Sequence, residues 1–515
     1  MTTPGTHPAD VVLGVDVGTT STKAVAFSAD ARTWSEAEEG YPLHEPAPGR
    51  AEQDAEQVVT AALAAIRRAA AGAVQSGARV RALAFSAGMH SLVGLDGGGR
   101  PLTPVLTWGD TRATAQADRL REHHADLYRR TGTPHHPMSP LAKLMWLREE
   151  QPELFARVDR WVQAKDLVLL RLCGELVIDH SCASGTGLLG LRRLEWDPEA
   201  LSLAGVGPER LPALVPAEHR LDLRADVGLP PGTPVVAGAG DGPLANLGVG
   251  AVHPGVAACS IGTSGALRVM VEEPAVDDRG RVFCYGLTPG RWVVGGAINN
   301  GGAVLRWATR ALGPGDGADG ELDRDAARSL LDMAAQVPAG SDGLIMLPYL
   351  LSERAPHWNA LPRGAYVGLT YAHTRGHLVR AALEGVCQQL ALVLGSMRAA
   401  GNEVREIRAT GGFARSPLWR QMLADALGMP IAFPAGHQGS AFGAALLGME
   451  ALGMIDSLDV AAERVPIEST VEPDPGAAAV YAATLPIFDD LYDELAPAFR
   501  ALHDLGESDE AGLPD

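Results

Sequence analysis

The chain has 515 residues, of which 43 are Lys or Arg and 62 are Asp or Glu, and its net charge is −19. This length predicts at least two domains, each large enough to bury its own core. The acidic balance disfavours nucleic acid and anionic membranes as partners, because both require a basic surface. A hydrophobic share of 46% with 20% charged residues excludes a disordered chain.

The cysteines and the N-terminal apolar run indicate the cellular compartment. The five cysteines are scattered and contain no Cys-x-x-Cys pair, which favours free thiols in a reducing compartment over disulfides or a zinc site. The first apolar run, residues 11–17, is too short to cross a membrane and carries Asp16. It also lacks a basic flank and a small-residue cleavage site, so we expect a soluble cytoplasmic protein without a signal peptide.

Arginine greatly outnumbers lysine among the basic residues. Lysine occurs three times, as Lys23, Lys143 and Lys165, and all the other basic residues are arginines. Such a bias favours lysine where a compact ammonium suits a site better than a planar guanidinium. Chance is the alternative.

Short apolar runs alternate with longer helical stretches, which predicts mixed α/β domains. Residues 11–17 and 24–27 flank a Gly-Thr-Thr turn and are expected to form a hairpin. In the first half we expect helices at 53–73, 117–130, 139–150 and 164–172, and strands at 80–86 and 234–238. In the second half we expect strands at 256–261 and 267–271, helices at 377–398, 416–427, 440–449 and 477–503, and a flexible acidic tail from about residue 504.

One pattern occurs twice, at residues 12–21 and 257–265. Each copy is an apolar strand, then glycine with small hydroxyl residues, then a second apolar strand. The copies lie about half a chain apart, so the sequence predicts a duplicated domain, with residues 1–243 as the first copy and 244–515 as the second. The second copy has Ser260 where the first has Asp16, so only the first supplies a carboxylate.

The two turns have the composition of phosphate-binding loops. Their candidate residues are Thr19, Thr20 and Ser21 in the first turn, and Gly262 and Thr263 in the second. Glycine lets the backbone approach an anion, while backbone N–H and hydroxyl donors converge on it. Lys23 can add a positive charge, and Asp16 is placed to hold Mg²⁺ through water. Ordinary hairpin turns are the alternative, and the chain contains no Walker A motif.

Two further glycine pairs and one carboxylate stand out. Gly411 and Gly412 follow a strand and precede a helix that starts near Ser416, an arrangement that suits a nucleotide but also a plain hinge. Gly302 lies in a comparable opening before a helix. Asp241 ends a strand between glycines, where a carboxylate can act as a general base or simply cap the next helix.

Together these segments resemble the FGGY family of carbohydrate kinases, which includes glycerol kinases, xylulokinases and gluconate kinases. The resemblance runs from about residue 11 to residue 449, with residues 16–23 and 262–264 similar to the two phosphate loops of the family. Residues 140–146, and 364–369 continuing to 377–384, are similar to its two signatures. The resemblance implies two actin-like (ribonuclease H-like) domains around a central cleft that binds ATP with Mg²⁺ and a sugar.

The resemblance also implies roles for individual residues. Asp241 matches the catalytic base, which would share Mg²⁺ with Asp16 through water, and Gly302, Gly412 and Ser416 match nucleotide-contacting positions. The substrate segments lie at residues 89–91, 107–112 and 133–140. Their candidate contacts, with one in the helix that follows, are Met89, His90, Trp108, Asp110, Arg112, Met138 and Lys143.

The substrate is suggested by short strings. Glycerol kinases have Arg-Glu where this chain has Met89-His90, and the strings at 88–93 and 135–141 look most like gluconate kinases, with xylulokinases next. Gluconate and ATP are both anions, so an acidic protein needs a local cationic pocket; Arg112, His90, His135, His136 and Lys143 are the candidates. Each has a structural alternative: Arg112 could pair with Asp110, and Trp108 could fill the core.

The sequence therefore predicts an enzyme that transfers phosphate from ATP to the primary hydroxyl of a sugar acid, gluconate giving 6-phosphogluconate. Xylulose or another polyol is the alternative substrate. A sugar-acid sensor without catalytic activity is the alternative from another class, although such a sensor has no need of Asp16, Asp241 and both turns. The partners expected are small molecules, with no nucleic acid and no membrane, and a homodimer is left open.

Overall fold

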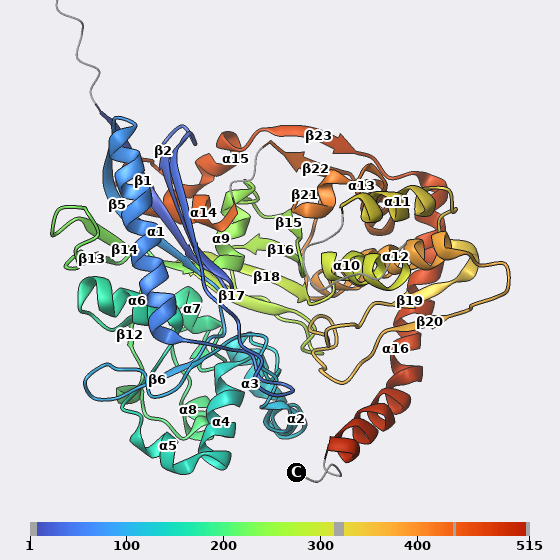
Figure 1. Cartoon of the computed structure of the whole chain (residues 1–515), viewed down its shortest axis with the longest axis horizontal. Coiled ribbons are helices and arrows are strands. Elements are labelled where there is room, and N and C mark those ends of the chain that lie inside the picture. The colour runs from blue at the N-terminus through green and yellow to red at the C-terminus, as the bar shows by residue number, and fades with distance from the viewer. Residues whose placement is uncertain (1–7, 314–323, 436–438, 511–515) are drawn as a thin grey trace, which may run out of the picture. The chain divides into compact units, whose positions relative to one another are not determined.

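The computed structural model describes residues 8–313, 324–435 and 439–510 (Figure 1). The chain divides into two compact units, each assembled from separate segments. Unit 1 contains the chain up to Pro254, Met270–Val294 and the segment that ends at Pro466. Unit 2 contains Gly255–Val269, the long segment that begins at Gly295, and the chain from Ile467 onward. The predicted division after residue 243 stays a prediction, since the compact units follow packing rather than chain order.

Unit 1 is built on a six-stranded sheet of order β13-β14-β5-β1-β2-β3. Its strands are β1 (Ala9–Val17), β2 (Ser21–Ser28), β3 (Thr33–Gly40), β5 (Ala78–Ala87), β13 (Arg220–Asp222) and β14 (Pro234–Gly240). β1 and β2 form the predicted antiparallel hairpin, and β1, β5 and β14 run parallel. The strand predicted at 234–238 continues two residues further, to Gly240.

The two faces of β1 are covered by different helices. Val11, Leu13 and Val15 belong to one core with α1 (Ala55–Gln75), in keeping with the alternation of side chains along a strand. The other face meets α14 (Gly439–Ala451), where a Cβ built on Gly448 would lie 2.9 Å from Val12 Cγ1. The expected helices at 53–73 and 440–449 are therefore confirmed, each within two residues at either end.

α14 packs by close approach of backbones. A Cβ on Gly14 would lie 1.8 Å from the carbonyl oxygen of Ala441, and one on Gly443 would lie 2.1 Å from that of Leu244. Leu244 lies in α9 (Asp241–Gly248), the helix that follows β14. Glycine is thus required where α14 meets both the central strand and α9.

A second core of unit 1 is mostly helical. Its helices are α2 (Thr114–His123), α3 (Ala125–Thr131), α4 (Pro140–Glu150), α5 (Pro152–Arg157) and α8 (Pro198–Ala204). α6 (Ala164–Cys173) packs into the first core with α1, and α7 (His180–Ser184) belongs to a smaller cluster. The single helix predicted at 117–130 is wrong, because His124 has φ −134° and ψ 36° and separates α2 from α3. Unit 1 also contains the strands β9 (Val177–Asp179) and β17 (Phe283–Thr288).

Unit 2 repeats the plan of unit 1. Its strands belong to the seven-stranded sheet of order β17-β18-β16-β15-β21-β22-β23, where β15 (Val256–Ile261) pairs antiparallel with β16 (Gly265–Val271) and parallel with β21 (Glu406–Thr410). The others are β18 (Arg291–Ile298), β22 (Ile431–Pro434) and β23 (Ile467–Val471). β15, β16 and β21 thus correspond to β1, β2 and β5, which confirms the predicted duplication of the strand–turn–strand pattern.

The long helices of unit 2 lie close to their predicted positions, except the helix at residues 324–335, which was not predicted. They are α10 (Gly302–Leu312), α11 (Arg324–Ala335), α12 (Arg375–Ala399), α13 (Pro417–Leu427) and α16 (Pro475–Glu510). The helix end predicted at residue 503 is wrong, because α16 continues to Glu510. Residues 511–515, the remainder of the predicted tail, lie outside the described residues.

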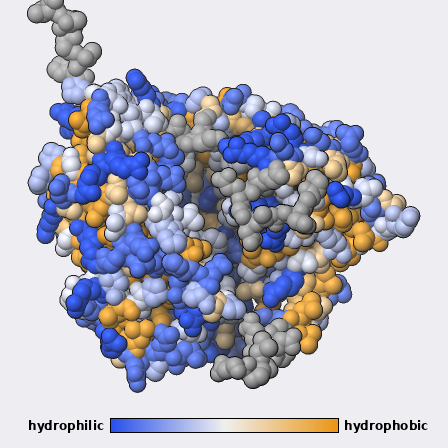
Figure 2. Space-filling view, viewed as in Figure 1, coloured by the Kyte–Doolittle hydropathy of each residue, from blue (hydrophilic) through white to orange (hydrophobic). Residues whose placement is uncertain are grey.

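Two helices of the described chain, α1 and α12, are long and apolar enough to cross a membrane by length and composition alone. In the most apolar stretch of each, 50% of α1 and 83% of α12 is buried inside the protein. The face shown in Figure 2 is largely hydrophilic, with small separate apolar patches. These helices are therefore core helices and do not indicate a membrane protein.

The glycine packing of α14 makes a prediction of stability. In a helix interior Gly→Ala normally stabilises by about 1 kcal/mol, but at Gly443 the new Cβ would overlap the Leu244 carbonyl. We expect Gly443→Ala to destabilise unit 1 by about 1–3 kcal/mol, the usual cost of overpacking, measured as a lower Tm by calorimetry. Gly395→Ala is the matched control: a Cβ added to this exposed glycine of α12 would meet no atom within 4 Å, so the Tm should stay or rise. A Tm raised by both substitutions would contradict the packing argument.

Candidate active site

The carboxyl ends of three parallel strands in unit 1 bring several predicted residues together. In the ladder, Asp16 of β1 and Ala239 of β14 both stand level with Ser86 of β5. The strands therefore end together, and the segments that follow carry the first turn, Met89-His90 and Asp241. One strand separates β1 from β14, so Asp16 and the end of β14 are about 10 Å apart.

Asp16 is a half-buried carboxylate held by hydroxyl groups. Ser86 Oγ donates to its Oδ1 at 2.7 Å, and Ser440 Oγ of α14 donates to its Oδ2 at 2.8 Å. Burial raises the pKa of Asp16, while these hydroxyls and the Lys23 ammonium oppose the rise. Lys23 lies opposite Asp16 on β2 and pairs with Glu36 at 2.7 Å. The sequence missed both serines, since only the strand register and the packing of α14 bring them to Asp16.

The first turn is tied to the second substrate segment. Trp108 Nε1 donates to Thr19 Oγ1 at 2.9 Å, which leaves the Thr19 hydroxyl hydrogen available to another acceptor. Gly18 N donates to Ser21 O at 3.0 Å and closes the turn. Ser21 Oγ donates to Glu38 at 2.6 Å, whereas Thr20 is exposed. Thr19 and Thr20 therefore keep hydroxyl donors for a ligand, and Trp108 positions Thr19.

Asp241 is half-buried at the junction of β14 and α9. The N-cap position of α9 belongs to Gly240, and Asp241 is the first helical residue. Its Oδ1 accepts a hydrogen bond from Gly242 N at 2.7 Å. A carboxylate at a strand end and a helix start, in line with the ends of β1 and β5, is well placed to accept a proton from a bound alcohol.

Met89 and His90 follow β5 and lie beside the end of β14. A Cβ built on Gly240 would lie 2.6 Å from Met89 Sδ, so Met89 packs directly over the residue before Asp241. His90 is nearly buried and has φ +69°, a conformation that is uncommon for a residue with a side chain. Its Nδ1 is 2.7 Å from Gly185 O and its Nε2 is 3.4 Å from Tyr285 Oη. Nδ1 therefore carries a proton, because it faces a carbonyl oxygen that can only accept. The role of His90 in substrate binding stays a prediction.

Lys143 is fully buried, and its ammonium faces backbone carbonyls. Nζ donates to His90 O at 2.8 Å, to Thr107 O at 2.6 Å and to Leu106 O at 3.4 Å. Burial lowers the pKa of Lys143 to about 7, and the nearby Asp110 opposes this shift. All three N–H donors of the ammonium thus hold the two substrate segments, and a direct substrate contact by Lys143 stays a prediction.

Arg112 and Asp110 form the ion pair that the sequence left as an alternative. Arg112 Nε and Nη2 donate to the two carboxylate oxygens of Asp110 at 2.8 and 2.7 Å, and Nη2 also bonds Glu52. Asp110 Oδ2 further accepts from Ala51 N at 3.0 Å. The Arg112 guanidinium also lies 5.1 Å from the Trp146 ring centre. Two carboxylates raise the pKa of Arg112 against the effect of burial. Its charge is therefore balanced within the protein, and its proposed contact with a sugar acid remains a prediction.

The third substrate segment is almost entirely buried. Met138 is 1% exposed, and its N donates to His136 Nδ1 at 3.2 Å. His135 Nε2 lies 3.0 Å from His124 O, and burial lowers the pKa of His135 to about 4. His135 is therefore neutral near pH 7 and does not supply the positive charge that the sequence offered.

In unit 2, the second turn lies at the carboxyl end of β15. Gly302 N donates to Gly262 O at 2.6 Å, and Ala303 N donates to Thr263 O at 3.0 Å, so the start of α10 holds the turn by its carbonyls. Arg306 Nη2 donates to Thr263 Oγ1 at 2.9 Å. Gly262 is exposed, and a Cβ built there would meet no atom within 4 Å. The turn is thus fixed from one side and open on the other.

The third glycine element lies beside this turn. β21 runs parallel to β15, and Gly411 after it has φ +116°, so that a Cβ added there would lie 2.3 Å from Ile261 O. Only glycine fits that approach. Gly412 is exposed and open, and Ser416 Oγ accepts from Trp419 N at 3.3 Å as the N-cap of α13. The predicted residues of unit 2 therefore follow or lie beside the carboxyl ends of β15 and β21; they are Gly262, Thr263, Gly302, Gly412 and Ser416.

The described residues contain no group of three or more His, Cys, Asp or Glu side chains that could hold a metal ion. Mg²⁺ is usually held by one or two carboxylates together with waters and substrate phosphates, so such a group is not required. A half-buried Asp16 with two hydroxyl donors and an adjacent ammonium fits a water-mediated contact of this kind.

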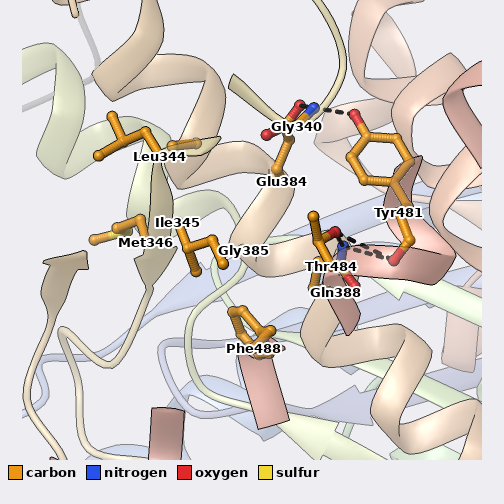
Figure 3. A pocket seen from close by; sticks show the side chains of 11 residues that line it. Gly340, Leu344, Ile345, Met346, Glu384, Gly385, Gln388, Tyr481, Thr484 and Phe488 are labelled. Atoms are coloured by element: carbon orange, nitrogen blue, oxygen red, sulfur yellow. Dashed lines mark hydrogen bonds between the residues drawn. The ribbon is translucent and has the colours of Figure 1, made fainter. Parts of the chain in front are cut away.

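A small cavity lies in unit 2 between α12, β19 (Ile345–Leu347) and α16 (Figure 3). Its volume is about 20 Å³, enough for one water molecule and far too small for a nucleotide or a sugar. Glu384 and Tyr481, which hydrogen bond at 2.8 Å, lie on its wall. Its lining includes none of the predicted site residues, so this cavity is not part of the predicted site.

Comparison with known proteins identifies the family. The model of the FGGY family N-terminal domain matches residues 11–248, and that of the C-terminal domain matches residues 257–452. The chain belongs to the FGGY family of carbohydrate kinases. This FGGY kinase is 40% identical to the gluconokinase of Bacillus subtilis over 93% of this chain and 95% of the relative. It is 31% identical to the xylulose kinase of the same organism, over 88% of this chain and 90% of that protein.

A solved structure shows the same fold. The gluconate kinase from Lactobacillus acidophilus aligns with this FGGY kinase at a TM-score of 0.89 and 33% identity, covering 96% of this chain and 99% of the other. The predicted family and the predicted two-domain actin-like fold are therefore confirmed. The protein is a phosphotransferase with an alcohol acceptor, and its substrates are ATP and a small sugar. The roles of the individual site residues stay predictions.

The neutral state of His135 predicts a pH dependence. Because the folded pKa is about 4 and the ordinary value is 6.5, the unfolded chain binds a proton between these pH values that the folded chain does not. The stability contributed by neutral His135 is full above pH 6.5 and is lost as the pH falls towards 4. Relative to His135→Gln, the wild type should lose up to about 1.4 kcal/mol of unfolding free energy per pH unit in this window.

Urea titrations at several pH values between 7 and 4.5, roughly the window set by this linkage, provide the measurement. His123→Gln on α2 is the control, because His123 is 66% exposed and should follow the wild type. Parallel curves for the wild type and His135→Gln would mean that folding does not lower the pKa of His135.

Proposed function

We propose that this FGGY kinase phosphorylates gluconate, transferring the γ-phosphoryl group of ATP to the primary hydroxyl and releasing 6-phosphogluconate and ADP. The strongest support for gluconate is the 40% identity to a gluconokinase over nearly the whole of both chains. The strongest support for phosphoryl transfer is that the parallel strands β1, β5 and β14 end next to one another. The first turn, His90 and Asp241 follow these strand ends.

The proposed reaction uses Asp241 as the base. The primary hydroxyl oxygen attacks the γ-phosphorus while the bond from γ-phosphorus to the β–γ bridging oxygen breaks, and the hydroxyl proton moves to Asp241. Thr19 and Thr20 in unit 1, and Gly262, Thr263, Gly302, Gly412 and Ser416 in unit 2, are proposed to donate to or enclose the nucleotide. Fixed donors of this kind stabilise the charge that spreads over the phosphoryl oxygens in the transition state.

Asp16, with Asp241, is the proposed position for Mg²⁺, held through water. When bound, Mg²⁺ neutralises part of the phosphate charge. Asp16 supplies a carboxylate whose geometry is fixed by Ser86 and Ser440, and Lys23 balances its charge. We propose that Ser21 supports the turn through Glu38 rather than through its own contact with phosphate.

The sugar is proposed to lie near Met89, His90 and Trp108. The ring of His90 is oriented by its Nδ1–H bond to Gly185 O, and the ring of Trp108 by its Nε1–H bond to Thr19 Oγ1. Asp110, Arg112, Met138 and Lys143 are proposed to shape this region from within, since all four are buried or ion-paired. We also propose that residues 1–243 act as the sugar-binding half, that residues 244–515 act as the nucleotide-binding half, and that the enzyme is cytoplasmic.

Xylulose is the second candidate substrate, favoured by the 31% identity to a xylulose kinase. ADP release measured by a coupled assay with gluconate, xylulose, ribulose, glycerol and no sugar separates the candidates. Gluconate should give the highest kcat/KM. A higher kcat/KM with xylulose would replace gluconate by the ketose, and turnover without any sugar would contradict a sugar kinase.

Asp241→Asn tests the base. The substitution keeps the size of the side chain but removes the proton acceptor, so kcat should fall by roughly 10²–10⁴-fold, while ATP binding measured by calorimetry is retained. Asp222→Asn is the matched control, because Asp222 is exposed on β13, paired with the opposite end of β14, and should leave kcat unchanged. Near-normal turnover in Asp241→Asn would remove Asp241 from the mechanism.

A further inference from the structure

The end of β14, which carries Asp241, is distorted by a bulge. Val236 pairs with Ala84 and Ala239 pairs with Ser86, so Ala237 and Gly238 stand opposite the single residue Phe85. Gly238 has φ +79°, and a Cβ there would lie 1.7 Å from Phe85 O. Only glycine can occupy this position, and the bulge alters the direction in which the strand delivers Asp241.

The backbone groups freed by the bulge have specific partners. Ala237 N and Gly238 N donate to His219 O and Ala217 O, both at 2.9 Å. The carbonyl of Ala237 instead accepts from Lys165 Nζ at 3.0 Å. Lys165, the second residue of α6, is 1% exposed, so a buried ammonium holds the bulged strand.

The ammonium also bonds the carboxylate of Asp179, and the pair leads back to β14. Asp179 Oδ1 accepts from Cys182 N at 2.9 Å and so caps α7. Ser181 in that helix accepts, through Oγ, a hydrogen bond from Gly240 N at 3.2 Å. Two side chains therefore hydrogen bond to β14. Lys165 binds the carbonyl of Ala237, and Ser181 binds the N–H of Gly240, the residue directly before Asp241.

The charges are consistent with this arrangement. Asp179 raises the pKa of Lys165 although burial opposes the charged form, so the ammonium is protonated. Burial raises the pKa of the neighbouring Asp166 to about 8, and the carboxylate that Lys165 contacts is that of Asp179. An ammonium can serve a carboxylate and a carbonyl in different directions, which a planar guanidinium does less well. This explains one of the three lysines in a chain that otherwise uses arginine.

We propose that Lys165 and Ser181 are positioning residues for phosphoryl transfer, which together fix the carboxylate of Asp241: Lys165 holds the β14 bulge, and Ser181 holds the N–H of Gly240. This inference rests on the proposed role of Asp241. A base misplaced by about 1 Å can lose about two orders of magnitude in rate, so loss of the grip should lower kcat more than it changes substrate binding.

Ser181→Ala is the decisive variant, because it removes one small acceptor and leaves the buried ion pair intact. We expect kcat for gluconate-dependent ADP release to fall about tenfold or more, with the KM values for ATP and gluconate changed less than about twofold. Lys165→Met should reduce kcat further, and if it fails to fold, Ser181→Ala decides alone. The control is Ser396→Ala in α12, which also removes a buried hydroxyl but one that only donates to Leu392 O, and it should leave kcat unchanged.

The effect of Ser181→Ala is then measured in an Asp241→Asn background. If Ser181 acts through Asp241, the substitution should no longer change the residual kcat, because residues that act as a unit are not additive. The same fold-loss in both backgrounds, or no loss in the single variant, would overturn the positioning role. Near-normal turnover of Asp241→Asn alone would instead overturn the proposed base, so the two failures are distinguishable.

Discussion

The parallel register of β1, β5 and β14 is the constraint on which the candidate site in unit 1 depends. It places Asp16, Ser86 and Ala239 at one level, and three separate stretches of chain leave the sheet there. A shift of one residue in any strand would turn its side chains to the other face of the sheet. The positions of the candidate site residues at these strand ends are therefore set by main-chain pairing.

Close backbone packing maintains this register from one side. Gly14 and Gly443 allow α14 to lie directly on β1 and α9, and the same helix carries Ser440 to the carboxylate of Asp16. Two buried lysines also hold backbone groups of unit 1. Lys143 gathers three carbonyls of the substrate segments, and Lys165 holds a carbonyl of β14. The enzyme thus uses charge inside unit 1 largely to position backbone, since an ammonium with several oxygen partners tolerates burial.

This use of charge bears on the recognition of an anionic sugar. Arg112, which seemed available to a carboxylate, is already matched by Asp110 and Glu52, and His135 is neutral. In the proposed function, neither Arg112 nor His135 therefore offers free positive charge to gluconate. The donors of His90 Nδ1 and Trp108 Nε1 are bonded to Gly185 and Thr19, so these residues are proposed to shape the sugar region through their fixed rings.

The sequence by itself determined the family, the duplicated strand–turn–strand plan and most helices, because glycine-hydroxyl turns, apolar periodicity and local signatures are encoded within short stretches. It failed where geometry depends on distant residues. The break between two helices at His124 is a local backbone conformation that helical periodicity does not predict. Arg112 could pair with Asp110 or bind the substrate, and only the folded chain shows that Asp110 and Glu52 both pair with it.

Only the tertiary structure decided how the candidate residues are supported. Ser86 and Ser440 lie far from Asp16 in sequence, and Ser181 lies far from Gly240, yet each pair is joined by one hydrogen bond. No local pattern predicts such pairs, because they arise from strand register and helix packing. The residue types of the site are thus a property of the sequence, and their orientation is a property of the folded chain.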